Sequence, residues 1–178
     1  MKLEVGPSTG FAPLTVSVTN NSASSANNLS ISTVYNFGNG TYSVSFTATD
    51  VPVTTYKAPG TYSVMAWVRK GACLDSVMKV VVVDIPSSIS IPNVFTPNND
   101  NVNDILFVKT ANMTEINMSI FDRWGHLVYE LNGATAIAWD GKNQMGKDCA
   151  EGTYFYIMTG KGKDGTDYKD KGNITLLR

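Results

Sequence analysis

The sequence contains few of the residues on which catalytic and metal centres depend. Its 178 residues include one His and two Cys, so a His-based triad or a Cys/His zinc site is poorly supplied. Charged residues make up 16%, below the roughly 25% typical of soluble domains. Because 14 basic residues nearly balance 15 acidic ones, a nucleic-acid footprint or a polybasic membrane patch is not expected.

Long apolar segments are missing as well. The longest apolar run, Val80–Val83, is far shorter than the roughly 20 residues of a transmembrane helix, so no membrane-spanning segment is expected. Residues Met1–Gly6 lack the apolar part of an export signal, and we interpret the chain as the C-terminal fragment of a longer protein. Cys73 and Cys149 do not form a disulfide framework, so we expect two unpaired thiols.

What the sequence does contain is apolar residues spaced with a period of two. Residues 61–70, 116–121 and 154–158 each alternate between two faces, and Asn-Gly, Pro-Gly and Asp-Gly pairs lie between such stretches. This pattern is typical of β-strands joined by tight turns. Hydrophobic residues make up 43% of the chain, which is enough to fill a core. The sequence therefore predicts an all-β chain built as β-sandwiches.

A change of pattern near Pro86 predicts two domains in tandem. An apolar strand over Val77–Val83 ends there, a short Pro/Ser stretch follows, and a new pattern begins at Ile91. We therefore expect a first domain over residues 1–85, a linker over 86–90 and a second domain over 91–178. Each domain is large enough for a small sandwich with its own core.

The first domain carries two turn motifs, Tyr35–Gly40 and Pro59–Val64. Pro59 and Gly60 suit the centre of a type II turn, and Tyr62 is placed to bury its ring and to tie the corner through its hydroxyl. With these motifs, residues 4–84 resemble the PKD domain. The resemblance implies an immunoglobulin-like sandwich that serves as a spacer on cell-surface proteins and secreted hydrolases.

The second domain carries five motifs in order. They are Ile91–Asp104, Ile120–Gly125, Trp139–Lys142, Glu151–Tyr156 and Lys171–Arg178. Their Gly and Asp residues predict tight turns, and Trp124 and Trp139 are large enough to seal the ends of a thin core. In order and spacing the motifs closely resemble the gliding-motility-associated C-terminal domain, which is the type B sorting domain of the type IX secretion system.

This resemblance implies an export signal rather than an enzyme. The parent would be a large bacterial cell-surface or secreted protein, of the gliding-motility adhesin kind, exported across the outer membrane. Its partners would be the type IX translocon and associated outer-membrane proteins. We expect the recognised surface in the last strand and in a turn before it, because a terminal strand is an exposed edge that a partner can extend. The residues are Lys171, Gly172, Asn173, Ile174, Thr175, Leu176, Leu177 and Arg178.

The loop Asn98–Asp104 is rich in oxygen donors. Asp100, Asn101, Asn103 and Asp104 lie within it, and such ligands suit Ca²⁺, which takes six to eight oxygens. The alternative is an Asx-turn network in which these side chains satisfy the backbone of their own loop without a metal. The short ligand set favours the network, and no other cofactor is predicted.

Two other functions are open at this stage. The two domains would form the polysaccharide-binding accessory module of a secreted hydrolase if Trp67 or Tyr56 were exposed to a glycan; the alternative for Trp67 is a core position. An enzyme would need a nucleophile with its base, or paired carboxylates in a cleft. No such spacing occurs, so we predict that the chain is not an enzyme.

Overall fold

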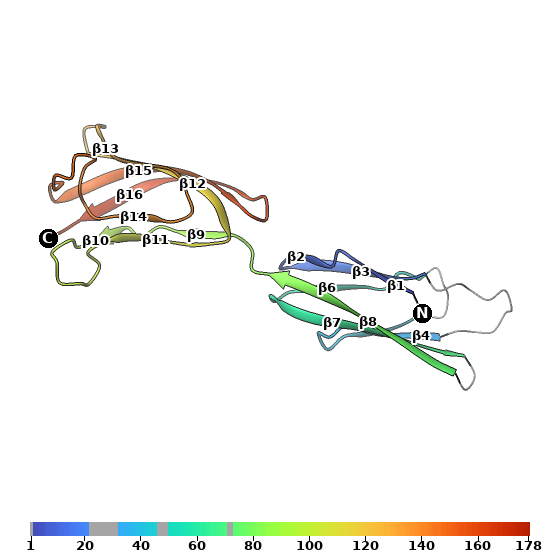
Figure 1. The fold of residues 1–178 in the computed structure, drawn as a ribbon. Helices are drawn as coiled ribbons and strands as arrows, with labels where there is room; N and C mark the ends of the chain where they lie inside the picture. Colours follow the sequence, from blue (N-terminus) through green and yellow to red (C-terminus); the bar gives the residue numbers. More distant parts are fainter. Residues whose placement is uncertain (1, 22–31, 46–49, 71–72) are drawn as a thin grey trace. The chain divides into compact units, whose positions relative to one another are not determined.

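Strands β1–β16 are the regular elements of the computed structural model, which describes residues 2–21, 32–45, 50–70 and 73–178. The chain divides into two units, Met1–Ile85 and Pro86–Arg178, and each encloses a hydrophobic core. Within each unit two sheets face one another (Figure 1). The prediction of an all-β chain with two immunoglobulin-like sandwiches is confirmed. The described residues include no helix long and apolar enough to cross a bilayer.

The first unit pairs a three-stranded sheet with a five-stranded one. The smaller sheet has the order β1-β3-β6, formed by β1 (Leu3–Gly6), β3 (Leu14–Asn20) and β6 (Val53–Tyr56). The larger has the order β2-β8-β7-β4-β5, formed by β2 (Thr9–Phe11), β4 (Ser32–Asn36), β5 (Tyr42–Ser45), β7 (Gly60–Lys70) and β8 (Cys73–Asp84). Alternate residues point inward: Val16 and Val18 on β3 meet Val64 and Ala66 on β7 in one buried cluster.

The second unit repeats this plan with different strands. Its three-stranded sheet has the order β14-β11-β9, formed by β9 (Ser88–Ser90), β11 (Leu106–Ala111) and β14 (Ile137–Trp139). Its five-stranded sheet has the order β10-β16-β15-β12-β13, formed by β10 (Val94–Phe95), β12 (Met113–Phe121), β13 (Leu127–Ala134), β15 (Gly152–Gly162) and β16 (Asp167–Leu176). Ile116, Met118 and Ile120 of β12 are buried, as their period-two spacing predicts.

Trp139 lies at the centre of the second core. Its side chain is fully buried between the rings of Phe95 and Tyr154, whose centroids lie 5.1 and 5.3 Å away. A buried indole needs an acceptor, and the chain turns at once so that the carbonyl of Lys142 receives the Nε1–H at 2.8 Å. Gly141 makes this turn with φ of 78°. The turn at Gly141 thus supplies the hydrogen-bond acceptor that allows the Trp139 indole to be buried.

Both units contain the same corner, built from a Gly-Thr-Tyr sequence. The hydroxyl of Tyr62 donates to the carbonyl of Ala58 at 2.8 Å, which confirms the predicted corner. In the second unit the hydroxyl of Tyr154 donates to the carbonyl of Ala150 at 2.7 Å. In each case the acceptor precedes the tyrosine by four residues, so the ring closes the turn that leads into the strand.

The predicted linker over residues 86–90 is shorter than expected. Ser88–Ser90 form β9, which pairs with β11. Just before β9, the backbone N–H and the hydroxyl of Ser87 donate to the two carboxylate oxygens of Asp164 at 2.8 and 2.6 Å. Tyr168 donates to the Ser87 carbonyl at 2.7 Å. These bonds hold the start of the second unit against the tip of the β15–β16 hairpin, which the sequence identified only as a turn.

Trp124 does not seal the core, contrary to the prediction from its size. Its side chain is 78% exposed at the turn between β12 and β13, whereas Trp139 is fully buried. Among the described residues, the indole in the core of this unit is that of Trp139, on β14. Cys149 is a buried free thiol; the side chain of Cys73 lies outside the described residues.

Candidate functional site

The C-terminal end of β16 lies between two neighbouring strands. Along its length β16 pairs with β15, and at Thr175 and Leu176 it also pairs, in parallel, with β10. The N–H of Thr175 donates to the carbonyl of Asn93 at 2.8 Å, and that of Leu177 to the carbonyl of Phe95 at 3.2 Å. The end of the strand is therefore not the open edge that the sequence predicted. Because β10 has only two residues, it could not be foreseen from periodicity.

The earlier part of β16 is different. Among the described strands, none pairs with the second side of β16 over residues 167–173. Lys171 and Gly172 lie inside this strand and not in a turn. Gly172 is needed for packing: a Cβ there would lie 2.8 Å from the hydroxyl of Tyr156. That hydroxyl donates to Asp170 at 2.8 Å, and burial together with the carboxylate raises the pKa of Tyr156 to about 12.

Five of the eight predicted recognition residues fall into two groups that differ in burial. Ile174 and Leu176 are fully buried members of the core. Lys171, Asn173 and Leu177 are exposed. A partner can contact the second group directly, whereas the first group maintains the fold on which the second depends.

Two exposed residues that the prediction omitted lie beside this second group. Phe155 and Ile157 of β15 are 49% and 56% exposed, and they pair with Asn173 and Lys171 of β16, respectively. Together with Tyr156 and Gly172 they line a shallow groove of about 340 Å³. The alternation of β15 contained this signal, because Tyr154, Tyr156 and Met158 face the core.

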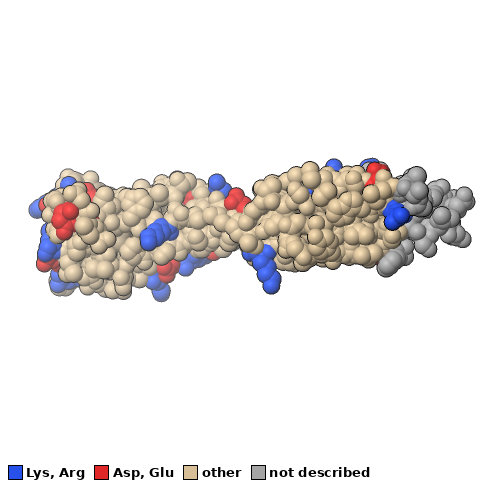
Figure 2. All heavy atoms as spheres, turned by 90° about the horizontal axis from the view of Figure 1, so that it is seen from below, with Lys and Arg blue, Asp and Glu red and all other residues tan. Residues whose placement is uncertain are grey.

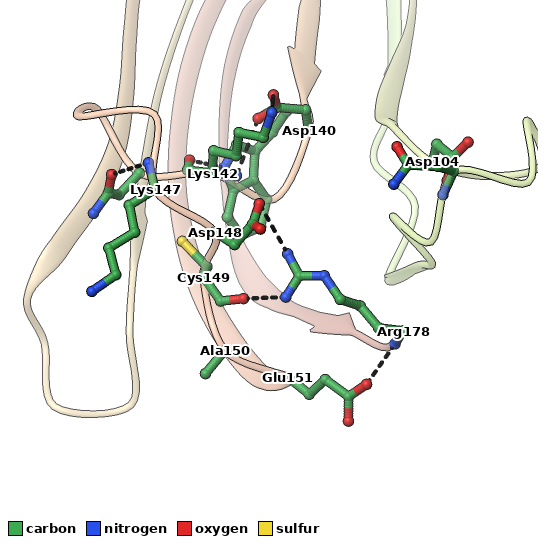
Figure 3. A network of polar contacts seen from close by, with 12 residues as sticks. Asp104, Asp140, Lys142, Lys147, Asp148, Cys149, Ala150, Glu151 and Arg178 are labelled. Atoms are coloured by element: carbon green, nitrogen blue, oxygen red, sulfur yellow. Dashed lines mark hydrogen bonds and ion pairs between the residues drawn. The ribbon is translucent and has the colours of Figure 1, made fainter.

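Arg178 fastens the segment that follows β16. Its guanidinium donates to the carbonyl of Cys149 at 2.6 Å and lies 3.6 Å from the carboxylate of Asp148. Its backbone N–H donates to Glu151 at 2.8 Å. Figure 3 shows the side chain reaching across the 148–151 loop, with Asp104 on a separate segment. Arg178 therefore joins this end of the unit to the 148–151 loop.

Charge is distributed without a dominant sign. On the face drawn in Figure 2, Lys and Arg side chains gather with Asp and Glu toward the end of the second unit and are sparse on the first.

Burial raises the pKa of the Cys149 thiol, and this rise is partly offset by its contact with Tyr154 and by the charge of Arg178. A thiol with a raised pKa is a poor nucleophile at neutral pH. The described residues include no group of three or more His, Cys, Asp and Glu arranged to hold a metal.

The Asn98–Asp104 loop uses its carboxylates on its own backbone. Asp104 accepts from the N–H groups of Asn99 and Asn101 at 2.6 and 2.8 Å. Asp100 accepts from the N–H of Val102 at 2.7 Å. Asn99, Asn101 and Asn103 take φ of 65°, 67° and 55°, which Asn tolerates better than most residues. This is the Asx-turn geometry that the sequence offered as the alternative to Ca²⁺, and a cation would compete with these bonds for Asp100 and Asp104.

Comparison with known families assigns the second unit. Residues 89–176 match the model of the CHU_C type IX secretion signal domain. The second unit belongs to this family. A type IX secretion signal domain directs export across the outer membrane, so the protein is located at the cell surface or secreted, and the secretion machinery is its partner. Sorting-signal and sandwich domains of this kind are typically not catalytic.

Solved structures with similar folds are distant. Fibronectin(III)-like modules of Clostridium thermocellum CbhA share 15% identity, with 99% of this chain and 93% of that chain covered, at a TM-score of 0.39. Dimeric latent PorU from Porphyromonas gingivalis shares 14% identity, with 98% of this chain and 20% of that chain covered, at a TM-score of 0.37. A 1.5-MDa bacterial ice-binding adhesin shares 12% identity, with 99% of this chain and 64% of that chain covered, at a TM-score of 0.42. No curated protein matches the chain.

Proposed function

We propose that the chain is the C-terminal region of a large surface adhesin of the gliding-motility kind. In this proposal a PKD-like spacer precedes the type IX secretion signal domain. The observation that carries the proposal is the family match over residues 89–176, which covers nearly the whole second unit. The first unit supports the proposal through its sandwich fold and through the corner at Tyr62, which lies within the residues that resemble the PKD domain.

For recognition, we propose a direct role for the exposed residues and a supporting role for the buried ones. Lys171, Asn173 and Leu177 would contact the translocon, with Arg178 holding the 148–151 loop in place. Gly172, Ile174, Thr175 and Leu176 would fix the strand on which these residues lie. Because β10 covers the end of β16, a partner that adds a strand would pair with the open side of residues 167–173.

The test is an export assay in a bacterium that has the type IX system. The 178-residue chain is fused behind a reporter that reaches the periplasm through its own signal peptide, and the reporter outside the cell is measured. Export that is absent, or unchanged in a strain without the translocon, would contradict the proposed function.

Truncation of residues 174–178 cannot test recognition alone, because it removes Ile174 and Leu176 from the core. We instead expect the triple change Lys171→Ala, Asn173→Ala and Leu177→Ala to leave the melting temperature nearly unchanged and to lower export. Lys109→Ala, an exposed change on the opposite sheet, is the matched control. Export of the triple variant at the level of the control would rule out direct recognition here.

The adhesin role needs a separate test. We expect cells in which the gene for the full-length protein is deleted to lose attachment or gliding on a surface. Restoration by the full-length gene, but not by one without the last 93 residues of this chain (Pro86–Arg178), would support export as the reason. Unchanged attachment and gliding in the deletion strain would contradict the adhesin proposal.

A polysaccharide-binding role for the first unit is the second candidate. Trp67 is half-buried, and its neighbours Val64 and Ala66 face the core, so it lies on the outer face of the sheet and not in the core. Tyr56 is 1% exposed and donates to the carbonyl of Phe37, so it cannot contact a glycan. Glycan-array binding that is lost in Trp67→Ala would support this candidate, and an array without binding would leave the spacer role alone.

A further inference from the structure

Two turns of the second unit have the same five-residue hydrogen-bond pattern. In Asp122–His126, the side-chain Oδ1 of Asp122 accepts from the N–H groups of Trp124 and His126 at 2.8 and 2.9 Å. In Asn143–Lys147, the Oδ1 of Asn143 accepts from the N–H groups of the third and fifth residues at 3.0 Å each. In both turns the N–H of the first residue donates to the carbonyl of the fifth at 2.9 Å.

The fourth residue of both turns is a glycine with positive φ. Gly125 has φ of 82° and Gly146 has φ of 74°, a conformation that other residues adopt only with strain. At the first turn a further bond of 3.0 Å joins Asp122 to the ring of His126. Desolvation opposes ionisation of Asp122. The backbone N–H groups of His126 and Trp124, together with the ring of His126, nevertheless hold the pKa of Asp122 below its usual value. The two turns, with the sequences DRWGH and NQMGK, are therefore closed by the same set of hydrogen bonds.

Each turn presents a large apolar side chain to solvent at its third position. Trp124 is 78% exposed and Met145 is 87% exposed. The turns are neighbours, because the N–H of Gln144 donates to the carbonyl of Val128, four residues after Trp124, at 3.1 Å. Residues of both turns and of the 148–154 segment line a groove of about 380 Å³. We call Trp124, Met145 and this groove the twin-turn surface.

On the twin-turn surface the carboxylates have partners within the unit, whereas two of the cations do not form ion pairs with described residues. Asp122 binds its own turn, and Asp148 and Glu151 bind Arg178. Arg123 and Lys147 are exposed, and within the described part of the chain no carboxylate lies within ion-pair distance of either. The surface thus combines two exposed apolar side chains with two unpaired cations.

We propose that the twin-turn surface docks a protein component of the type IX machinery that offers an apolar pocket bordered by carboxylates. This inference rests on the proposed export function and adds a second contact to the surface on β16. Trp, Met and Arg are enriched at protein interfaces, and Trp and Arg dominate hot spots. A preformed turn loses little conformational entropy on binding. Arg123 and Lys147 have no carboxylate of the described residues within ion-pair distance, so their charge favours a partner that offers carboxylates.

The proposal is tested with the export assay and with crosslinking in the same host. The double variant Trp124→Ala and Met145→Ala keeps the residues that make both turns, so we expect its melting temperature to stay near that of the wild type. We expect its export to fall about tenfold or more, the loss typical of a hot-spot residue. Phe107→Ala is the matched control, because Phe107 is 58% exposed on the opposite sheet. The charge change Arg123→Glu with Lys147→Glu should also lower export.

The outcomes separate this inference from the proposed function. A wild-type chain that fails to export the reporter overturns the proposed function. Wild-type export together with normal export of both variants overturns the twin-turn surface alone. A photocrosslinker at position 124 should join the chain to a secretion component through a segment that contains Asp or Glu, and a carboxylate-to-lysine change there should restore export of the Arg123→Glu, Lys147→Glu variant. Crosslinking only to glycan, or to another copy of the chain, contradicts the proposal.

Discussion

The two units share a corner but differ in what holds their ends. Both use a Gly-Thr-Tyr turn whose tyrosine donates to the carbonyl four residues earlier. In the second unit, side chains also fix both ends, through Ser87 with Asp164 and through Arg178 with the 148–151 loop. A domain that is recognised as a folded signal benefits from such fixed ends. Four experiments test this difference, from the largest expected effect to the smallest.

The largest effect is expected from removing a core ring in one unit at a time. Trp139→Ala in the second unit and Phe37→Ala in the first each delete a buried aromatic side chain. We expect each change to cost about 3–5 kcal/mol of unfolding free energy. Because the two cores are separate, calorimetry should show that each variant lowers the transition of its own unit and leaves the other transition in place. Parallel loss of both transitions would contradict the independence of the cores.

The tyrosine corners should give a smaller and unequal effect. Tyr154→Phe and Tyr62→Phe each remove one hydrogen bond to a backbone carbonyl. We expect losses of about 0.5–1.5 kcal/mol, with the larger loss in the second unit, because Tyr154 is buried and Tyr62 is half-exposed. Denaturant titration of the two variants measures both losses. A larger loss at Tyr62 would show that burial does not set the strength of this corner.

How far the sequence predicts the two units can be judged from these same residues. The corner at Tyr62 was predicted because it depends on local turn chemistry, and strands β7, β12 and β15 were predicted because their alternation is local. The exposed position of Trp124 was not predicted. An indole after a turn can face either the core or the solvent, and the choice depends on the packing of the whole core, which Trp139 occupies.

Long-range pairing explains the remaining differences at the candidate site. The open edge predicted for Asn173–Arg178 was wrong at its end because the two residues of β10 are too few to show a pattern. The anchor at Ser87 joins residues 77 positions apart, a distance over which no local signal acts. Phe155 and Ile157 were visible as one face of a strand, but nothing in the sequence shows whether a second sheet covers that face.

The pH dependence of stability should distinguish the second unit. The hydroxyl and N–H of Ser87, with a further contribution from Thr166, hold the pKa of Asp164 well below its usual range. As the pH falls, Asp164 therefore takes up its proton near pH 4 in the unfolded chain, and only at lower pH in the folded one. The stabilisation is present above that pH and is lost as the pH falls toward the pKa of the folded state.

We expect Asp164→Asn to lower the melting temperature of the second unit at pH 7 and to have a smaller effect at pH 3. The first unit, whose core and tyrosine corner do not involve Asp164, serves as the internal control in the same melting curves. An equal loss at both pH values would show that the carboxylate charge does not contribute to the anchor.

The smallest effect is expected from Ca²⁺, and it compares the Asx-rich loops of the two units. In the first unit, Asn36 and Asn39 accept from the N–H groups of Gly38 and Thr41 at 2.8 and 3.1 Å, and the loop is built on amides and not carboxylates. In the second, Asp100 and Asp104 have charged oxygens, but backbone N–H groups already occupy them. We therefore expect millimolar Ca²⁺ to leave both melting transitions unchanged, because binding would exchange these bonds for metal ligands. A rise confined to the second transition, and absent in Asp104→Asn, would instead establish Asp100, Asn101, Asn103 and Asp104 as a cation site whose loop rearranges on binding.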